Sequence, residues 1–188
     1  MDSKKVDLYQ DITTIDYPAG EVDEIRLHHV FEHFTYSGTL NLLQQWHRAL
    51  RLGGKLTIET PDIKACSQTI FNSSAPFDVR QRVMRHVYGS HEVYWANHYD
   101  GWYEDKYRRI LPRFGFRVTS IDKTEYRRLS NIIVHAVRVK LLTKVELLAA
   151  ITQTLQDYMV DHSATEEKLF GIWMKEIDLK PVVPTRQS

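Results

Sequence analysis

The stretch VDEIRLHHVFEHF, residues 22–34, joins a short strand pattern to three histidines and a glutamate. Within it, Asp23–His29 shows some of the alternation of apolar and polar residues that is typical of a β-strand. Ser37–Arg51 has apolar residues at three- and four-residue steps, which predicts a helix that Gly53-Gly54 ends. Lys55–Thr60 is rich in β-forming residues. The sequence therefore predicts a strand–helix–strand unit with a histidine-rich bend after its first strand.

The same patterns predict further elements on both sides of this unit. We expect strands at Val6–Tyr9, Phe116–Asp122 and Ile132–Val139, and helices at Asp62–Phe71, Asp78–Val87 and Glu104–Phe114. Strands that alternate with helices favour an α/β fold whose mostly parallel sheet is covered on both faces. The two late strands follow one another directly, which suggests an antiparallel edge.

The pattern changes after Lys140. Apolar residues at helical spacing, together with a capping-box pattern formed by Ser163 and Glu166, predict a helical hairpin over residues 141–180. We therefore divide the chain into an α/β domain, residues 1–140, and a C-terminal helical appendage, residues 141–188.

Composition excludes several function classes. The formal net charge is +1, which gives no electrostatic signature for binding nucleic acid or an anionic membrane. No apolar run approaches the roughly 20 residues of a membrane helix. Cys66 is the single cysteine, so no internal disulfide is expected, and a cytoplasmic location fits best.

The histidine-rich bend, residues 28–33, allows more than one interpretation. His29, Glu32 and His33 have the H-x-x-E-H spacing of some zinc peptidases. That chemistry needs both histidines on one helix and a third ligand downstream. Here the motif follows a strand, so the two histidines would not converge, and we expect no metal. Alternatively, the histidines only finish the strand and pair with carbonyls or with Glu32.

A wider resemblance gives a third interpretation. Residues 22–34, the helix containing WHRAL (residues 46–50) and the segment RLGGKLTIETPD (residues 51–62) together resemble the middle of class I S-adenosylmethionine-dependent methyltransferases. The likeness is to the small-domain group associated with modification of sugars and cell-surface polymers. DLYQDI (residues 7–12) and HYDGWYEDKYRRILPRFGF (residues 98–116) extend it to about residues 6–139. Leu52 stands where that family usually has proline, a mild departure.

The resemblance implies a Rossmann-like sheet, mostly parallel with an antiparallel last strand, and S-adenosylmethionine as cofactor. It would place His29 and Val30 beside the methionine part of the cofactor, and Asp11 and Ile12 near its adenine. Ligands of open α/β sheets bind at the carboxyl ends of the strands, where Glu32 would face the substrate.

The resemblance also exposes a gap at the start of the chain. That family holds its cofactor with a Gly-rich turn and a ribose-binding acid, and no G-x-G pattern occurs before residue 20. Asp2 is a weak candidate for the acid. We expect an N-terminally shortened domain with weak or absent cofactor binding and an open edge at the strand of residues 24–29. A homodimer, the N-terminal strand or the C-terminal hairpin could cover that edge, or another chain could supply the missing half.

Methyl transfer to oxygen needs alignment and a base, and we rank His98 and His33 as the candidate catalytic residues. A turn-capping role for His98 is an equal alternative. Trp95 and Tyr99 lie in an aromatic-rich loop and would stack on a substrate, although packing of that loop is favoured. The expected function is S-adenosylmethionine-dependent methyl transfer to a small molecule or glycan. The alternative is a non-catalytic binding or assembly protein of the same fold.

Overall fold

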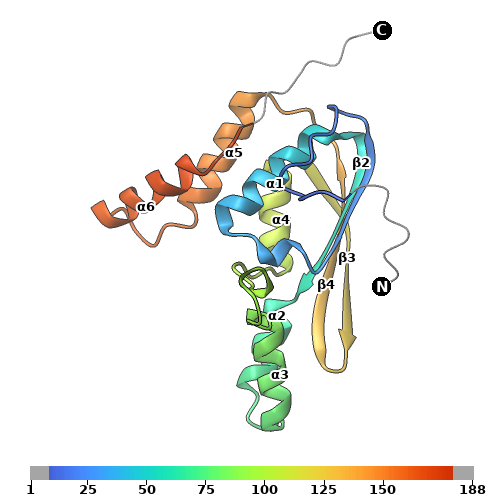
Figure 1. Ribbon diagram of the computed structural model, residues 1–188, viewed down its shortest axis with the longest axis vertical. Coiled ribbons are helices and arrows are strands. Elements are labelled where there is room, and N and C mark those ends of the chain that lie inside the picture. Colours follow the sequence, from blue (N-terminus) through green and yellow to red (C-terminus); the bar gives the residue numbers. More distant parts are fainter. Residues whose placement is uncertain (1–8, 180–188) are drawn as a thin grey trace.

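Between residues 9 and 179, the computed structural model contains four β-strands and six α-helices (Figure 1). The strand expected at Val6–Tyr9 lies mainly outside these described residues, and Tyr9 itself is exposed and has no regular structure. None of the helices in this part of the chain combines the length and apolar character needed to span a bilayer.

The four strands form one mixed sheet in the order β1-β2-β4-β3. Their bounds are β1 Val22–His28, β2 Leu50–Pro61, β3 Phe116–Tyr126 and β4 Leu129–Arg138. β1 and β2 pair in parallel, whereas β4 is antiparallel to both of its neighbours. The antiparallel last strand is confirmed, but it lies inside the sheet and leaves β3 at the edge. β1, β2 and β3 therefore run in the same direction and β4 alone is reversed, as expected for a mostly parallel sheet with one antiparallel strand, although two of the three strand pairings are antiparallel.

The strand–helix–strand unit forms as predicted. Helix α1, Tyr36–Ala49, begins at Thr35, whose side chain accepts a hydrogen bond from the backbone N–H of Gly38. It ends at Ala49, earlier than expected, because Leu50 is already extended and fully buried as the first residue of β2. The side chains of Leu40, Leu43 and Trp46 lie in the core at the predicted helical spacing.

Helices cover one face of the sheet. α1 and α4, Glu104–Arg113, lie on the same side of it (Figure 1), where Ile58 and Val134 are buried. The opposite face carries polar cross-strand contacts, such as His135 with Thr57 and with Asp122. A sheet covered on both faces was therefore the wrong expectation for the described residues, since polar side chains occupy the positions that a second helical layer would bury.

Two helices extend from the body beside the tip of the β3–β4 hairpin (Figure 1). They are α2, Ile63–Phe71, and α3, Phe77–Tyr88. Asp62 caps α2 by accepting hydrogen bonds from the N–H groups of Lys64 and Ala65. The hairpin turns at Arg127 and Arg128, both with positive φ, so its strands run further than the sequence indicated.

The C-terminal helices are α5, Lys144–Gln156, and α6, Ala164–Lys175. The complete capping box is at Thr143 and Glu146 of α5, where none was predicted. Ser163 does cap α6, but the side chain of Glu166 accepts a hydrogen bond from the backbone of Val160 instead. Leu147, Ile151 and Leu155 of α5 join the same hydrophobic core as the sheet. The division of the chain after residue 140 stays a prediction.

Candidate functional site

The histidine-rich bend lies at the carboxyl end of β1. After His28 the chain turns sharply at His29, which has a left-handed φ of 52° and donates its backbone N–H to the carbonyl of Glu59. A short 3-10 helix, η2, follows over Phe31–His33. Phe31 is fully buried, with its ring 4.8 Å from Trp102 and 5.3 Å from Trp46 between centroids. This anchor fixes the direction in which the neighbouring polar side chains project.

Two carboxylates hold the bend together. Glu59 on β2 lies opposite His28, with Oε2 2.6 Å from Nδ1 of that imidazole. Nδ1 of His29 lies 3.0 Å from Oε1 of Glu32, and this hydrogen bond raises the pKa of His29. Glu32 itself is 1% exposed, and its second oxygen, Oε2, is buried with no hydrogen-bond partner among residues 9–179. A buried carboxylate of this kind is costly unless something else satisfies it.

His33 and His98 meet edge to face, with ring centroids 4.6 Å apart. Nδ1 of His33 is 3.1 Å from the carbonyl oxygen of Asn97, and Nδ1 of His98 is 3.1 Å from that of Val87. A carbonyl oxygen can only accept, so each Nδ1 carries the proton and each neutral ring has an unprotonated Nε2. Burial lowers the pKa of His98, which favours the neutral form.

The loop that carries His98 is tied to the bend and to α4. The backbone N–H of Tyr99 donates to the carbonyl oxygen of Glu32 at 2.9 Å. The next residue, Asp100, forms a buried ion pair with Lys106 at 2.5 Å. The loop therefore holds His98 over the bend by backbone and charge contacts.

α3 and β4 complete the site from the other side. The amide of Asn131 donates from Nδ2 to Oε1 of Glu59, so its Oδ1 accepts from Nε2 of His86 at 2.8 Å. Burial lowers the pKa of His86, whose ring centroid is 5.7 Å from that of His29. Neither His86 nor Asn131 was predicted as a site residue, because no local pattern marks a helix residue and a strand residue that meet only in the folded chain.

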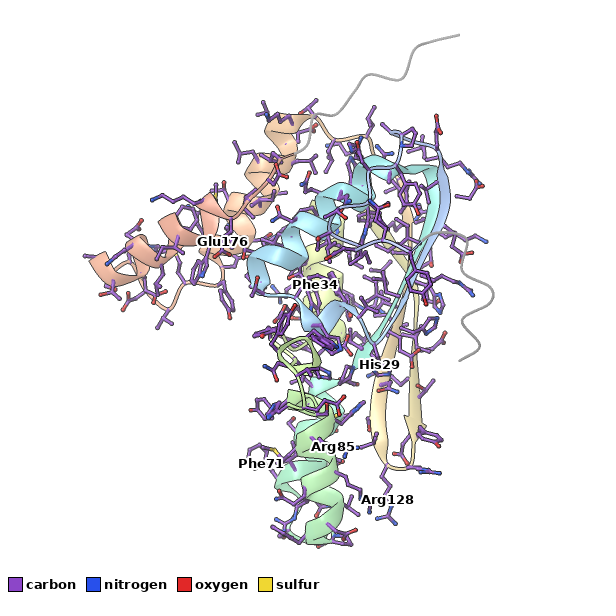
Figure 2. All side chains as sticks on the ribbon, viewed as in Figure 1. His29, Phe34, Phe71, Arg85, Arg128 and Glu176 are labelled. Atoms are coloured by element: carbon purple, nitrogen blue, oxygen red, sulfur yellow. The ribbon has the colours of Figure 1, made fainter. Side chains whose placement is uncertain are left out.

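These residues surround a cavity of about 580 Å³ at the carboxyl ends of β1 and β2, which we call the corner cavity. In Figure 2, His29 lies above Arg85 of α3 and above Arg128 at the hairpin tip. The cavity is lined by His29, His33, Arg82, Arg85, His86, Gly89, Ser90, Ala96, His98, Tyr126, Arg127, Leu129 and Asn131. Its position is the one where open α/β sheets bind ligands, and its size suits a small molecule.

The structure brings some of the predicted site residues together. His29, His33 and His98 all line the corner cavity. Val30, partly buried, precedes η2, and Glu32 is buried within η2 and is not among the residues that line the cavity. Trp95 and Tyr99 are exposed, at 62% and 51%, and are not among the residues that line it.

The residues predicted near adenine lie elsewhere. Asp11 is an exposed turn residue whose carboxylate accepts from the backbone and hydroxyl of Thr13. Ile12 lines a smaller apolar groove between β1 and α1, together with Ile25 and Trp46. Asp2 lies outside the described residues. His29 and Ile12 thus line different hollows, and the cofactor-binding role of these residues stays a prediction.

The aromatic loop was expected to pack onto the body, and it does so in part. Trp102 is fully buried and stacks near Tyr107, with 4.7 Å between ring centroids. The other Tyr and Trp residues in and beside this loop are exposed: Tyr88, Tyr94, Trp95, Tyr99 and Tyr103. The loop is therefore anchored through Trp102 while its other rings face solvent.

One group of side chains has the composition of a metal site. Glu32, His33 and His98 each offer one ligand atom, and these atoms lie within 4.8 Å of one another. Glu32 and His33 come from the H-x-x-E-H motif, but the third member comes from the distant loop in place of His29.

Solved structures give the comparison with known proteins, since no family model and no curated sequence matches the chain. A complex of the Haloferax volcanii Trm112 methyltransferase activator with a protein assigned as a methyltransferase matches 71% of this chain and 60% of that one, with 12% identity and a TM-score of 0.50. The 1,6-didemethyltoxoflavin-N1-methyltransferase of Burkholderia thailandensis, with bound S-adenosylhomocysteine, matches 69% of this chain and 48% of that one, with 15% identity and a TM-score of 0.49. Magnesium protoporphyrin IX methyltransferase from Synechocystis, also with bound S-adenosylhomocysteine, matches 69% of this chain and 49% of that one, at 17% identity and a TM-score of 0.46.

These matches concern the fold. Over 71% of its length the chain has the fold of the protein assigned as a methyltransferase in the Haloferax volcanii complex, the match among these three whose TM-score reaches 0.50. It spans less than two-thirds of the length of each of these structures. The fold is therefore methyltransferase-like.

Proposed function

We propose that this chain is a methyltransferase-like protein that uses S-adenosylmethionine to methylate an oxygen of a small molecule or glycan. The observation that carries the proposal is the corner cavity, which lies at the carboxyl ends of β1 and β2 and is lined by His29, His33 and His98. This is the position that ligands occupy in open α/β sheets.

The chemistry asks little of the protein beyond alignment. When bound, S-adenosylmethionine supplies the methyl group from its sulfonium centre, and the thioether S-adenosylhomocysteine is the leaving group. His33 and His98 each present an unprotonated Nε2, because their Nδ1 protons are donated to backbone carbonyls. In the proposal, one of these nitrogens takes the hydroxyl proton as the acceptor oxygen forms its bond to the methyl carbon.

The fit to the cofactor is partial. His29 lines the corner cavity, and Val30 is the next residue in the chain. Both positions suit contact with the methionine part of the cofactor. Asp11 and Ile12, proposed for the adenine part, lie on the segment beside the separate apolar groove. We therefore propose that the chain alone binds the cofactor weakly, with a dissociation constant well above the micromolar range.

Calorimetric titration of the full chain with S-adenosylmethionine tests this proposal. We expect weak but saturable binding that the variant His29→Ala reduces and the variant His162→Ala leaves unchanged. Micromolar binding would contradict the weak-binding part of the proposal. Absence of saturation at millimolar cofactor would contradict cofactor use by this chain.

A second candidate function is assembly without catalysis. β1 pairs only with β2 among the described strands, so its outer edge is open. Beside that edge lies the apolar groove formed by residues that include Ile12, Ile25 and Trp46. An open edge next to apolar surface favours pairing with another chain, and we propose a homodimer through this edge or through α5 and α6. Light scattering coupled to size-exclusion chromatography would give a dimer mass if so, and a monomer mass at all concentrations would contradict it.

A further inference from the structure

We propose that Glu32, His33 and His98 form a binding site for a divalent transition-metal ion, with zinc as the best match. Their candidate ligand atoms lie within 4.8 Å of one another, and two of the three residues, His33 and His98, line the corner cavity. The sequence argued against a metal because His29 and His33 would not converge. The fold changes the argument, since it replaces His29 with His98 as the partner of His33.

The hydrogen bonds of both histidines prepare them as ligands. Nδ1 of His33 donates to the carbonyl oxygen of Asn97, and Nδ1 of His98 donates to that of Val87. A metal-binding histidine commonly donates its other ring N–H to a carbonyl or carboxylate, which fixes the tautomer and the ring orientation. In the described part of the chain no hydrogen bond involves either Nε2 atom, so both lone pairs can bind an ion.

Glu32 supplies an independent observation. Its side chain is buried, and Oε2 has no hydrogen-bond partner among the described residues, whereas Oε1 is held by His29. An unsatisfied buried oxygen costs on the order of 1–3 kcal/mol, and more when it is charged. A cation would satisfy this oxygen and remove that cost.

The donor set indicates the class of metal. Two imidazole nitrogens and one carboxylate oxygen suit zinc and neighbouring first-row metals, whereas magnesium and calcium prefer oxygen ligands throughout. Ligand atoms about 2.0–2.1 Å from a tetrahedral zinc ion lie about 3.3 Å apart, so small side-chain rotations would have to bring the three atoms closer. Three protein ligands also leave one position open, and the cavity lies beside it.

Metal binding does not depend on methyl transfer. The inference concerns only the ligand atoms of this chain, and it stands if the chain proves to be an assembly protein. If the chain both transfers methyl groups and binds a metal ion, the ion would be bound by the Nε2 atoms of His33 and His98. The histidines would then act on the acceptor hydroxyl through the ion, by lowering the pKa of the bound oxygen, and not as direct bases.

Cobalt titration of the full, untagged, metal-stripped chain tests the inference. Cobalt should give visible absorption bands of low coordination number that saturate at one ion per chain, and one equivalent of zinc should abolish them. The variants His33→Ala and His98→Ala should each lose at least about tenfold in zinc affinity, measured by competition with a chromophoric chelator. Glu32→Gln should lose affinity while retaining the helical circular dichroism of the parent chain.

His135→Ala is the matched control, because His135 binds Thr57 and Asp122 on the polar face of the sheet, away from the cavity. Its zinc affinity should equal that of the parent chain. Binding below one ion per chain, or a double variant His33→Ala/His98→Ala with parental affinity, would overturn the inference. Neither result bears on calorimetry with S-adenosylmethionine, so failure of the metal site and failure of the proposed function are distinguishable.

Discussion

The rings of His33 and His98 meet edge to face with centroids 4.6 Å apart, although one follows β1 and the other belongs to a distant loop. The ring of His33 donates its Nδ1 proton to the carbonyl oxygen of Asn97 in that loop, and the ring of His98 donates to that of Val87 near the end of α3. The site therefore depends on the conformation of that loop as much as on the H-x-x-E-H motif.

Gly89 controls the conformation of this loop. It has a φ of 89°, and a Cβ added there would lie 1.9 Å from the carbonyl oxygen of Ala96. We expect Gly89→Ala to destabilise the chain by more than about 1 kcal/mol and to expose the loop to proteolysis. Gly171→Ala is the control, because nothing lies within 4 Å of its added Cβ in α6, and it should stabilise by about 0.5–1 kcal/mol. Equal effects of the two substitutions on urea unfolding would contradict this account of the loop.

Phe31 is the apolar anchor of the bend. Its ring is fully buried between Trp46 and Trp102. Phe31→Ala should lower the free energy of unfolding by about 3–5 kcal/mol, because it removes a large side chain from a closed core. The same substitution at Phe71, which is 85% exposed, should change it by no more than about 0.5 kcal/mol. Chemical denaturation measures both, and a small loss at Phe31 would show that the anchor does not form.

His47 should make the free energy of unfolding depend on pH. It is buried in α1, where desolvation, with a smaller effect of the Arg138 charge, lowers its pKa from 6.5 to about 4. A histidine whose pKa is lower in the folded chain than in the unfolded chain favours folding in its neutral form. Its contribution to the free energy of unfolding is therefore complete above about pH 6.5 and is lost as the pH falls toward 4. The difference corresponds to about 3 kcal/mol.

The variant His47→Gln isolates this contribution, because the glutamine oxygen can replace Nε2 as the acceptor for the backbone N–H of Leu142. The loss of unfolding free energy between pH 7 and pH 4.5 should be smaller in this variant than in the parent chain. His162→Gln, at an exposed position, should keep the parental pH dependence. Identical pH profiles for the parent chain and His47→Gln would contradict the prediction.

The two C-terminal helix caps should differ in importance. Thr143 forms a complete capping box with Glu146 at the start of α5, which buries Leu147 and Leu155. Thr143→Ala should cost about 1 kcal/mol in the free energy of unfolding. Ser163→Ala removes the cap of α6, a helix with no buried residues, and should cost less. The reverse order in thermal denaturation would show that α6 contributes more to the core than its exposure indicates.

Local patterns were sufficient for the central unit. The helical spacing around Leu40 and Leu43, followed by the β-rich run at residues 55–60, predicted α1 and β2. The position of His29 at the end of β1 followed from the same reasoning. These features depend on residues close in sequence, which is why the sequence alone was informative.

Long-range features could not be obtained in this way. The tight turn at Arg127 and Arg128 uses two positive φ values where asparagine and glycine are the usual residues, so its sequence carried no turn signal. His86 joins the site through contacts with Asn131 and His29, which lie on other parts of the chain. Pairing of His33 with His98 likewise depends on the loop conformation and not on spacing in the motif.

The central claim is that the corner cavity binds the cofactor beside His29 and Val30. The most direct test is a series of amide ¹H–¹⁵N spectra of the labelled chain, recorded as S-adenosylhomocysteine is added up to millimolar concentration. We predict progressive shifts of the His29 and Val30 signals and of residues around His98. Shifts confined to the groove at Ile12 and Ile25, or spectra that do not change, would contradict the claim.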